Sequence, residues 1–324
     1  MNGGSWLLLC DASPVLRRRA LTELLDAPPS DPEVAELDAQ RLTCPEVAEL
    51  LAAEPADLKD AVWSLCRLAY HGVDRGVAPR VAELAERVFA AQRDDGSFPL
   101  EAFRHTDTYS TMPLQTSLPL RGLAAAGYAQ DPRADRAYEW LLGQRLDDGA
   151  WPTGRASGQT GYVAGYRSLP GSAGCRANTE AAIAALALHP SRARTTETRR
   201  ALDLLLQRET RDEWALGTEV SRLRGLDPPA GFLTFYARFD LAFVLELASR
   251  AGATMEDARV ADLAGFLLDR RGPAGLWQHP THPELSRWLS FDLMLSLRRL
   301  DAGDWAGVAP RLPFHPYRPA PRRY

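Results

Sequence analysis

Lysine is almost absent from this chain of 324 residues. Lys59 is the single lysine, so nearly all of the 38 basic side chains are arginines, and they stand against 42 acidic ones. The resulting net charge of −4 leaves no basic surplus, which a nucleic-acid-binding surface requires. We therefore expect no nucleic-acid partner.

Closely spaced cysteines and long apolar runs are missing as well. The four cysteines are far apart and form no Cys-x-x-Cys pair, which excludes the disulfide framework of a small secreted domain. No apolar run approaches the ~20 residues that a membrane span needs. The apolar opening, 6–10, is short and has no basic leader, so we read no export signal and expect a cytoplasmic protein.

Strand-like alternation is absent too, and a helical pattern takes its place. Four times, an amphipathic segment ends in an amide-type side chain, and a polar turn and an aromatic residue follow. The amide-to-aromatic gap is 6, 7, 7 and 7 residues, and the segments recur after 52, 63 and 63 residues. The pairs are Gln92 and Phe98, Gln144 and Trp151, Gln207 and Trp214, and Arg270 and Trp277, where Arg270 replaces glutamine. Such regularity is typical of repeated helix pairs.

Two kinds of helix alternate in this pattern. Segment 80–89 has one charged face and predicts an outer helix, whereas segments such as 181–188 are apolar nearly all round and predict inner helices. The expected inner helices span about 58–71, 109–126, 177–188, 236–250 and 286–300.

The N-terminal region adds two expected helices, 14–26 and 33–42, the first with a good start at Ser13-Pro14. We therefore predict an all-α protein, an α/α toroid of alternating inner and outer helices. Its single domain is expected to span 1–308, with 1–50 completing the ring and a Pro/Arg-rich irregular tail over 309–324. Long loops are expected at 152–174, 215–234 and 271–285.

The pattern resembles the Gln-Trp repeat of squalene and oxidosqualene cyclases and of protein prenyltransferase β subunits, over about residues 55–305. It looks closest to small stand-alone bacterial proteins of the prenyltransferase/squalene-oxidase-repeat family. Leu7–Leu25, Cys175 before an inner helix and Ser286-Arg287-Trp288 fit that group. The resemblance implies a toroid, but a toroid hosts several chemistries and does not fix the reaction.

The motifs that carry the chemistry of those enzymes are missing. The cyclases protonate their substrates with Asp-x-Asp-Asp, and the prenyltransferases bind zinc through Asp-x-Cys and a distant histidine; the sequence has neither motif. His279 and His282 have a spacing that suits a metal, but two prolines and the lack of a clear third ligand favour a loop role. We expect no metal and no cofactor.

Carboxylates recur near the starts of the inner helices, roughly three helical turns before their ends. They are Asp60, Glu180, Asp240 and Asp292, with Thr116 in the second inner helix. At one level of an apolar cavity, desolvation and mutual repulsion would raise at least one pKa and create a general acid. The alternative is a structural role, because acidic side chains near helix starts interact favourably with the helix dipole or pair with arginine. We take Asp240, Asp292 and Glu180 as candidate catalytic acids.

Arginines also lie near four inner-helix starts, at Arg104, Arg176, Arg238 and Arg287. They suit recognition of a diphosphate or carboxylate, and pairing with the acids is an equally good interpretation. Aromatic side chains nearby can stabilise a carbocation, although core packing is the simpler role. The candidate substrate-binding residues are Tyr109, Phe235, Tyr236, Arg238, Arg287 and Trp288.

Two functions follow from these patterns. The first is a terpene-cyclase/prenyltransferase-like enzyme that acts on an isoprenoid or other apolar small molecule in a central cavity, by acid-initiated cyclisation or isomerisation. The second is a non-catalytic toroid that binds a lipid, peptide or protein partner, which the missing motifs favour. A deep cavity with converging acids would support the first, and a ring filled by side chains the second.

Overall fold

The computed structural model describes residues 4–99, 112–152, 169, 171–207, 214–226 and 239–308. Within these ranges the elements are helices, apart from two parallel strands of two residues each, β1 (Trp214–Ala215) and β2 (Phe239–Asp240). The prediction of an all-α fold is confirmed. Among the same residues there is no helix whose length and apolar character would let it cross a membrane.

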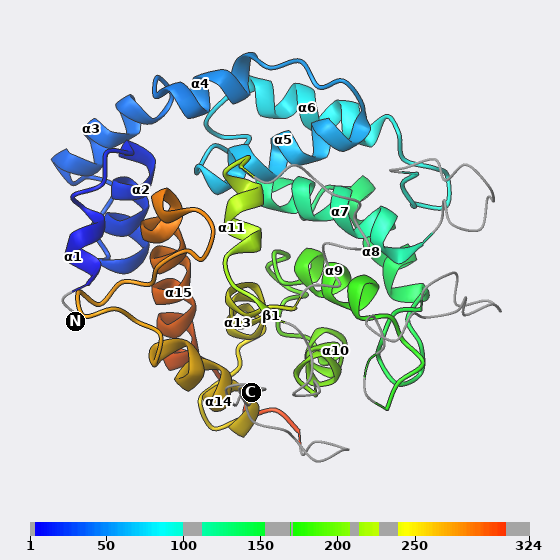
Figure 1. The fold of residues 1–324 in the computed structure, drawn as a ribbon. Coiled ribbons are helices and arrows are strands. Elements are labelled where there is room, and N and C mark those ends of the chain that lie inside the picture. The colour runs from blue at the N-terminus through cyan, green and yellow to red at the C-terminus, as the bar shows by residue number, and fades with distance from the viewer. Residues whose placement is uncertain are drawn as a thin grey trace.

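The helices form a ring of two layers (Figure 1). The inner layer contains α5 (Leu58–Tyr70), α7 (Pro113–Leu123), α9 (Arg176–Leu186), α13 (Leu241–Arg250) and α15 (Ser286–Asp301). The outer layer contains α6 (Pro79–Phe89), α8 (Pro132–Gly143), α10 (Thr196–Leu206) and α14 (Ala258–Leu268). Each outer helix packs against the inner helix of its own pair, and α7 packs against both α5 and α9. The chain is therefore an α/α toroid, as predicted.

The N-terminal helices lie beside the last inner helix and the first one. They are α1 (Ser5–Leu8), α2 (Pro14–Arg19), the π-helical turn η1 (Ala20–Leu24), α3 (Pro32–Arg41) and α4 (Pro45–Ala52). Both α1 and η1 contact α15, and α4 contacts α5, so this region joins the two ends of the ring (Figure 1). The expected helices 14–26 and 33–42 correspond to α2 with η1 and to α3, whereas α4 was not expected.

Burial separates the two layers as the apolar pattern predicted. All residues of α7 and of α9 are buried. In contrast, α6 buries one face, made of Val81, Leu84, Ala85, Val88 and Phe89, and exposes most of its charged residues. Helices buried all round belong to the interior of a fold, and one-sided helices cover it.

The same turn follows α6, α8 and α14. In each turn a glycine has a positive φ, +90° at Gly96, +104° at Gly149 and +79° at Gly275. Its N–H donates to the carbonyl three residues earlier at 2.9 Å in all three cases. Glycine is the residue that adopts this conformation without steric cost, so the turn explains why these three positions are glycines.

The aromatic residue after each turn fastens the outer layer to the inner one. Its backbone N–H donates to a hydroxyl group on the next inner helix, from Phe98 to Thr116 (3.1 Å), from Trp151 to Thr179 (3.0 Å) and from Trp277 to Ser290 (2.8 Å). The Nε1 groups of both tryptophans also donate to a carbonyl ten residues earlier, at Leu141 (2.7 Å) and Leu267 (2.6 Å).

Gly96→Ala tests the first turn. We expect it to lower the free energy of unfolding by about 2 kcal/mol, because an L-residue resists this conformation. The new Cβ would also lie 2.6 Å from the Arg136 carbonyl oxygen. Gly143→Ala is the control: no atom lies within 4 Å of its Cβ position in α8, so it should stabilise by about 0.5–1 kcal/mol. Urea denaturation followed by circular dichroism measures both, and equal effects of the two substitutions would contradict this account.

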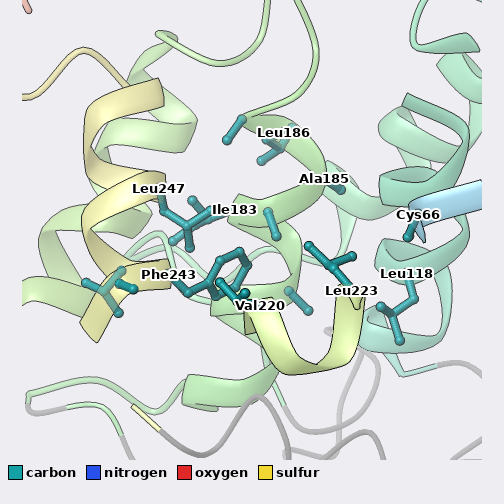
Figure 2. Packing of buried hydrophobic residues seen from close by; sticks show 14 of the residues in the cluster. Cys66, Leu118, Ile183, Ala185, Leu186, Val220, Leu223, Phe243 and Leu247 are labelled. Atoms are coloured by element: carbon teal, nitrogen blue, oxygen red, sulfur yellow. The ribbon is translucent and has the colours of Figure 1, made fainter. Parts of the chain in front are cut away.

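The middle of the ring is occupied. The short helix α11 (Thr218–Leu223) lies there, within the segment 215–234 that was expected to be a loop, so that expectation was wrong for these six residues (Figure 1). Figure 2 shows Val220 and Leu223 of α11 packed among Leu118, Ile183 and Phe243. The apolar side chains of α11 thus complete the core that the inner helices surround.

Candidate active site

Glu180 is the most unusual ionisable group of the ring. It lies on α9 with only 1% of its surface exposed, and neither carboxyl oxygen has a hydrogen-bond partner in the part of the chain that the structure describes. Burial raises its pKa well above the ordinary value; nearby Arg176 opposes the rise, and the charges of Asp240 and Glu219 add to it. Burial thus favours the protonated form of Glu180, the form that can donate a proton.

Asp240 lies close to Glu180 but has a structural role. It caps the N-terminus of α13, and its carboxylate accepts hydrogen bonds from the backbone N–H groups of Ala242 (3.1 Å), Gly217 (3.1 Å) and Glu219 (2.8 Å). Burial raises its pKa, and these backbone hydrogen bonds oppose the rise because they stabilise the ionised form. Asp240 thus connects the start of α11 to the start of α13 through hydrogen bonds.

Glu219 and Arg121 complete this buried group, and sequence reasoning missed both. Arg121 of α7 forms an ion pair with Glu219 of α11 in which both side chains are buried. The second carboxylate oxygen of Glu219 has no hydrogen-bond partner within the described ranges. Three acids from α9, α11 and the start of α13 thus gather around the central helix. The only sequence signal for Glu219 was its place two residues after a glycine, Gly217. In the structure Gly217 has a φ of +78° and is the N-cap of α11.

Asp292 belongs to another part of the molecule. It accepts a hydrogen bond from the Tyr70 hydroxyl at 2.8 Å and lines a cavity of about 190 Å³ where the inner helices end. Burial raises its pKa to about 7, against the attraction of Arg19. Neither Glu180 nor Asp240 lines this cavity.

The four predicted acids therefore do not form one ring, and helix register explains why. Thr179 and Ser290 make equivalent hydrogen bonds to the turn tryptophans, which aligns α9 with α15. On that alignment Glu180 follows its hydroxyl residue by one position and Asp292 follows by two, so they point about 100° apart. Asp60, in the first turn of α5, is exposed. Counting back from the helix ends could not detect these differences.

The remaining predicted residues are dispersed. Arg287 is on the outer side of α15 and holds the N-terminal region, bonding the Cys10 carbonyl (3.0 Å) and Asp11 (3.3 Å). Trp288 is buried between Tyr70, at 5.3 Å between ring centroids, and the guanidinium of Arg224. Four residues lie outside the described parts of the chain: Tyr109, Phe235, Tyr236 and Arg238.

His279 contacts Ser221, a pair that resembles a nucleophile and its base, at 2.9 Å between Oγ and Nε2. Its Nδ1 accepts from the backbone N–H of His282 (3.0 Å), which places the ring proton on Nε2. That proton is then donated towards the Gly217 carbonyl at 2.8 Å. His279 therefore cannot accept the Ser221 proton, and both of its nitrogens are used within the protein. Among the described residues no group of three or more His, Cys, Asp and Glu side chains is placed to hold a metal ion.

Comparison with known proteins gives similarity to solved structures alone. No protein-family model and no curated protein matches the chain. A type II terpene cyclase from Scytonema, in complex with its substrate geranylgeranyl dihydroxybenzoate, is 14% identical, with a TM-score of 0.45 over 82% of this chain and 77% of that chain. A protein from Actinoplanes is 16% identical, with a TM-score of 0.35 over 82% of this chain and 99% of that chain. Because both TM-scores are below 0.5, the role of the candidate site is inferred from the geometry of this chain alone.

Proposed function

We propose that the chain is an enzyme that protonates an apolar small molecule, an isoprenoid by preference, with Glu180 as the proton donor. The observation that carries the proposal is the buried Glu180 carboxyl, which has no hydrogen-bond partner among the described residues and whose pKa is raised by burial. A polar group in such surroundings costs folding free energy, and that cost is typical of functional sites. Of the three candidate acids, Glu180 fits a general acid best.

The reaction that this acid supports is cyclisation or isomerisation. The Glu180 O–H bond breaks as its proton passes to a carbon–carbon double bond or an epoxide oxygen of the substrate, which becomes a carbocation. Loss of a proton from the rearranged cation completes the reaction, so that no atom is gained or lost overall. Asp240 positions α11 and Glu219 beside the acid, and Tyr109, Tyr236 and Arg238 remain the predicted residues for lining the path and orienting a polar head.

Glu180→Gln is the test. The amide keeps the shape of the side chain but cannot donate a proton in this way, so we expect turnover of isoprenoid diphosphates or epoxides to fall at least about a hundredfold. Glu83→Gln, on the exposed face of α6, is the matched control and should leave turnover unchanged. Full turnover by Glu180→Gln would contradict Glu180 as the donor, and full turnover by Asp240→Asn and Asp292→Asn as well would rule out all three candidate acids. The absence of any turnover by the wild type on both substrate classes would also count against the mechanism.

The second function, a toroid that binds a partner without catalysis, has one observation in its favour. The apolar side chains of α11 fill the centre of the ring, and the cavity beside them is about 190 Å³, below the ~300–1,000 Å³ of typical ligand pockets. Native mass spectrometry of the purified protein separates the two functions. A retained apolar small molecule supports the enzyme, and a retained peptide or protein supports the partner-binding toroid.

A further inference from the structure

The cavity beside Asp292 has chemistry that the proposed function does not use. It lies where the inner helices end, with α11 contributing Leu223 to its wall. Four guanidinium groups and two carboxyl groups form its charged lining: Arg19, Arg121, Arg250, Arg299, Glu246 and Asp292. Four converging arginines are unusual in so small a space.

Two of these arginines are already bonded to other groups of the protein. Arg19 bonds Glu23 through Nε (2.7 Å) and Nη2 (3.2 Å), and its Nη1 donates to the Tyr70 carbonyl (3.1 Å). Arg121 is paired with Glu219. Both are therefore held by the protein itself.

The other two arginines retain free donors. Arg250 donates from Nε to Glu246 at 2.8 Å, and neither of its terminal nitrogens has an acceptor in the described ranges. Arg299 is half-buried and makes no side-chain hydrogen bond or ion pair with any described residue. Each of these guanidinium nitrogens is a hydrogen-bond donor for which the described residues supply no acceptor.

Packing brings these donors together. Arg250 and Arg299 lie in the last turns of α13 and α15, two inner helices that pack closely. Burial and the neighbouring charge of Arg250 lower the pKa of Arg299 to about 10, although Glu246 and Glu23 attract it. The negative ends of the helix dipoles compensate part of this repulsion. An anion between the two guanidinium groups would compensate the rest.

The size of the cavity limits that anion. Its volume of about 190 Å³ equals roughly six water molecules at ~30 Å³ each, which excludes a long isoprenoid chain. Arginine forks match the oxygen geometry of phosphate and bind it through paired N–H groups. We propose that this cavity binds a compact tetrahedral oxyanion, phosphate or a terminal phosphate group, through Arg250 and Arg299. The site is separate from Glu180 and does not depend on the proposed function.

Asp292 makes this binding depend on pH. It is faced by Arg19 of α2, Glu23 of η1, Tyr70 of α5 and Glu246 of α13, and its pKa of about 7 lets it change charge near neutrality. A bound dianion repels the ionised carboxylate, so binding should be stronger when Asp292 is protonated. Sulfate is a suitable probe because, unlike phosphate, it stays divalent throughout this range. We expect its affinity to rise as the pH falls from about 8 to about 6.

Isothermal titration of the full chain with sodium sulfate at pH 6.5 tests the site. Arg299→Gln and Arg250→Gln should each weaken binding about tenfold or more, because each removes hydrogen bonds to a charged ligand. The matched control is Arg298→Gln: Arg298 is the neighbouring arginine of α15, but it pairs with Asp26 at 2.6 Å on the surface. It should bind sulfate as the wild type does.

Further variants keep the outcome decisive. Arg299→Lys retains the charge but loses the fork, so it should bind with intermediate affinity, and Glu180→Gln should bind normally. No binding of millimolar sulfate by the wild type, or equal affinities of Arg298→Gln and Arg299→Gln, would overturn the proposal. Titration with inorganic phosphate and with a phosphomonoester distinguishes the two sources, since only the favoured one should bind more tightly than sulfate.

Discussion

Trp277→Ala is expected to lower the free energy of unfolding by about 4 kcal/mol, the usual cost of removing a buried tryptophan. Trp277 has 1% of its surface exposed and packs in the turn that joins α14 to α15. The substitution would leave a large cavity. It would also leave the Leu267 carbonyl without the indole N–H, which lies 2.6 Å away.

Two companion substitutions separate these contributions. Trp277→Phe fills most of the space but leaves Leu267 without its donor, so it should cost about 1–2 kcal/mol. Trp6→Ala is the control, because Trp6 is 54% exposed and its removal should change stability by less than about 0.5 kcal/mol. Urea denaturation followed by far-ultraviolet circular dichroism measures all three. Equal losses for Trp6→Ala and Trp277→Ala would show that the turn tryptophan does not fasten the two layers.

Arg259→Met should lower the free energy of unfolding by about 3–5 kcal/mol, because it leaves two buried carboxylates without their ion-pair partner. Arg259 is 2% exposed and binds Asp257, the N-cap of its own helix α14, and Asp203 of the preceding outer helix, each at 2.5 Å. Burial already raises the pKa of Asp203, and Arg259 opposes that rise, so without the guanidinium this pKa should rise further. The loss of stability is then present at neutral pH and diminishes as the pH falls and the Asp203 carboxylate becomes protonated.

The chain contains its own control for this experiment. Arg133 has the same arrangement at the start of α8, where it binds the N-cap Asp131 at 2.9 Å and Glu86 of the preceding outer helix at 2.8 Å. A third of its side chain and most of the Glu86 side chain are exposed, so water screens the pair. Arg133→Met should therefore cost no more than about 1 kcal/mol. Similar losses at the two positions would mean that burial does not govern the strength of this motif.

The helices of the ring could be predicted because their signals are local and long. The expected inner helix 286–300 is α15 to within one residue, and 58–71 is α5 to within one residue, because apolar periodicity over ten or more residues suffices to find them. In contrast, α11 has six residues, too few to show a period. The start of α11 is held by Asp240, whose carboxylate accepts a hydrogen bond from the Glu219 N–H. The two residues are 21 positions apart in the sequence.

The candidate site was harder to predict because side-chain direction depends on single residues. Asp292 and Glu180 were expected at one level, and a one-residue difference in register sends them to different places. Arg287 was expected inside the ring, yet it binds the segment of Cys10 and Asp11, a contact 277 residues away in sequence that no local pattern shows. The value of Glu180 as a candidate comes from what surrounds it, and its neighbours come from three separate elements.

The guanidinium of Arg121 links the two proposed sites. It lines the small cavity, and through its bond to Glu219 it stands within the electrostatic field that sets the acidity of Glu180. An oxyanion that attracts Arg121 would weaken its hold on Glu219 and make Glu180 a weaker acid. Thermodynamic reciprocity requires that the ionisation of Glu180 alter anion affinity by the same factor. Through Arg121, anion binding in the cavity and the ionisation of Glu180 would therefore be coupled.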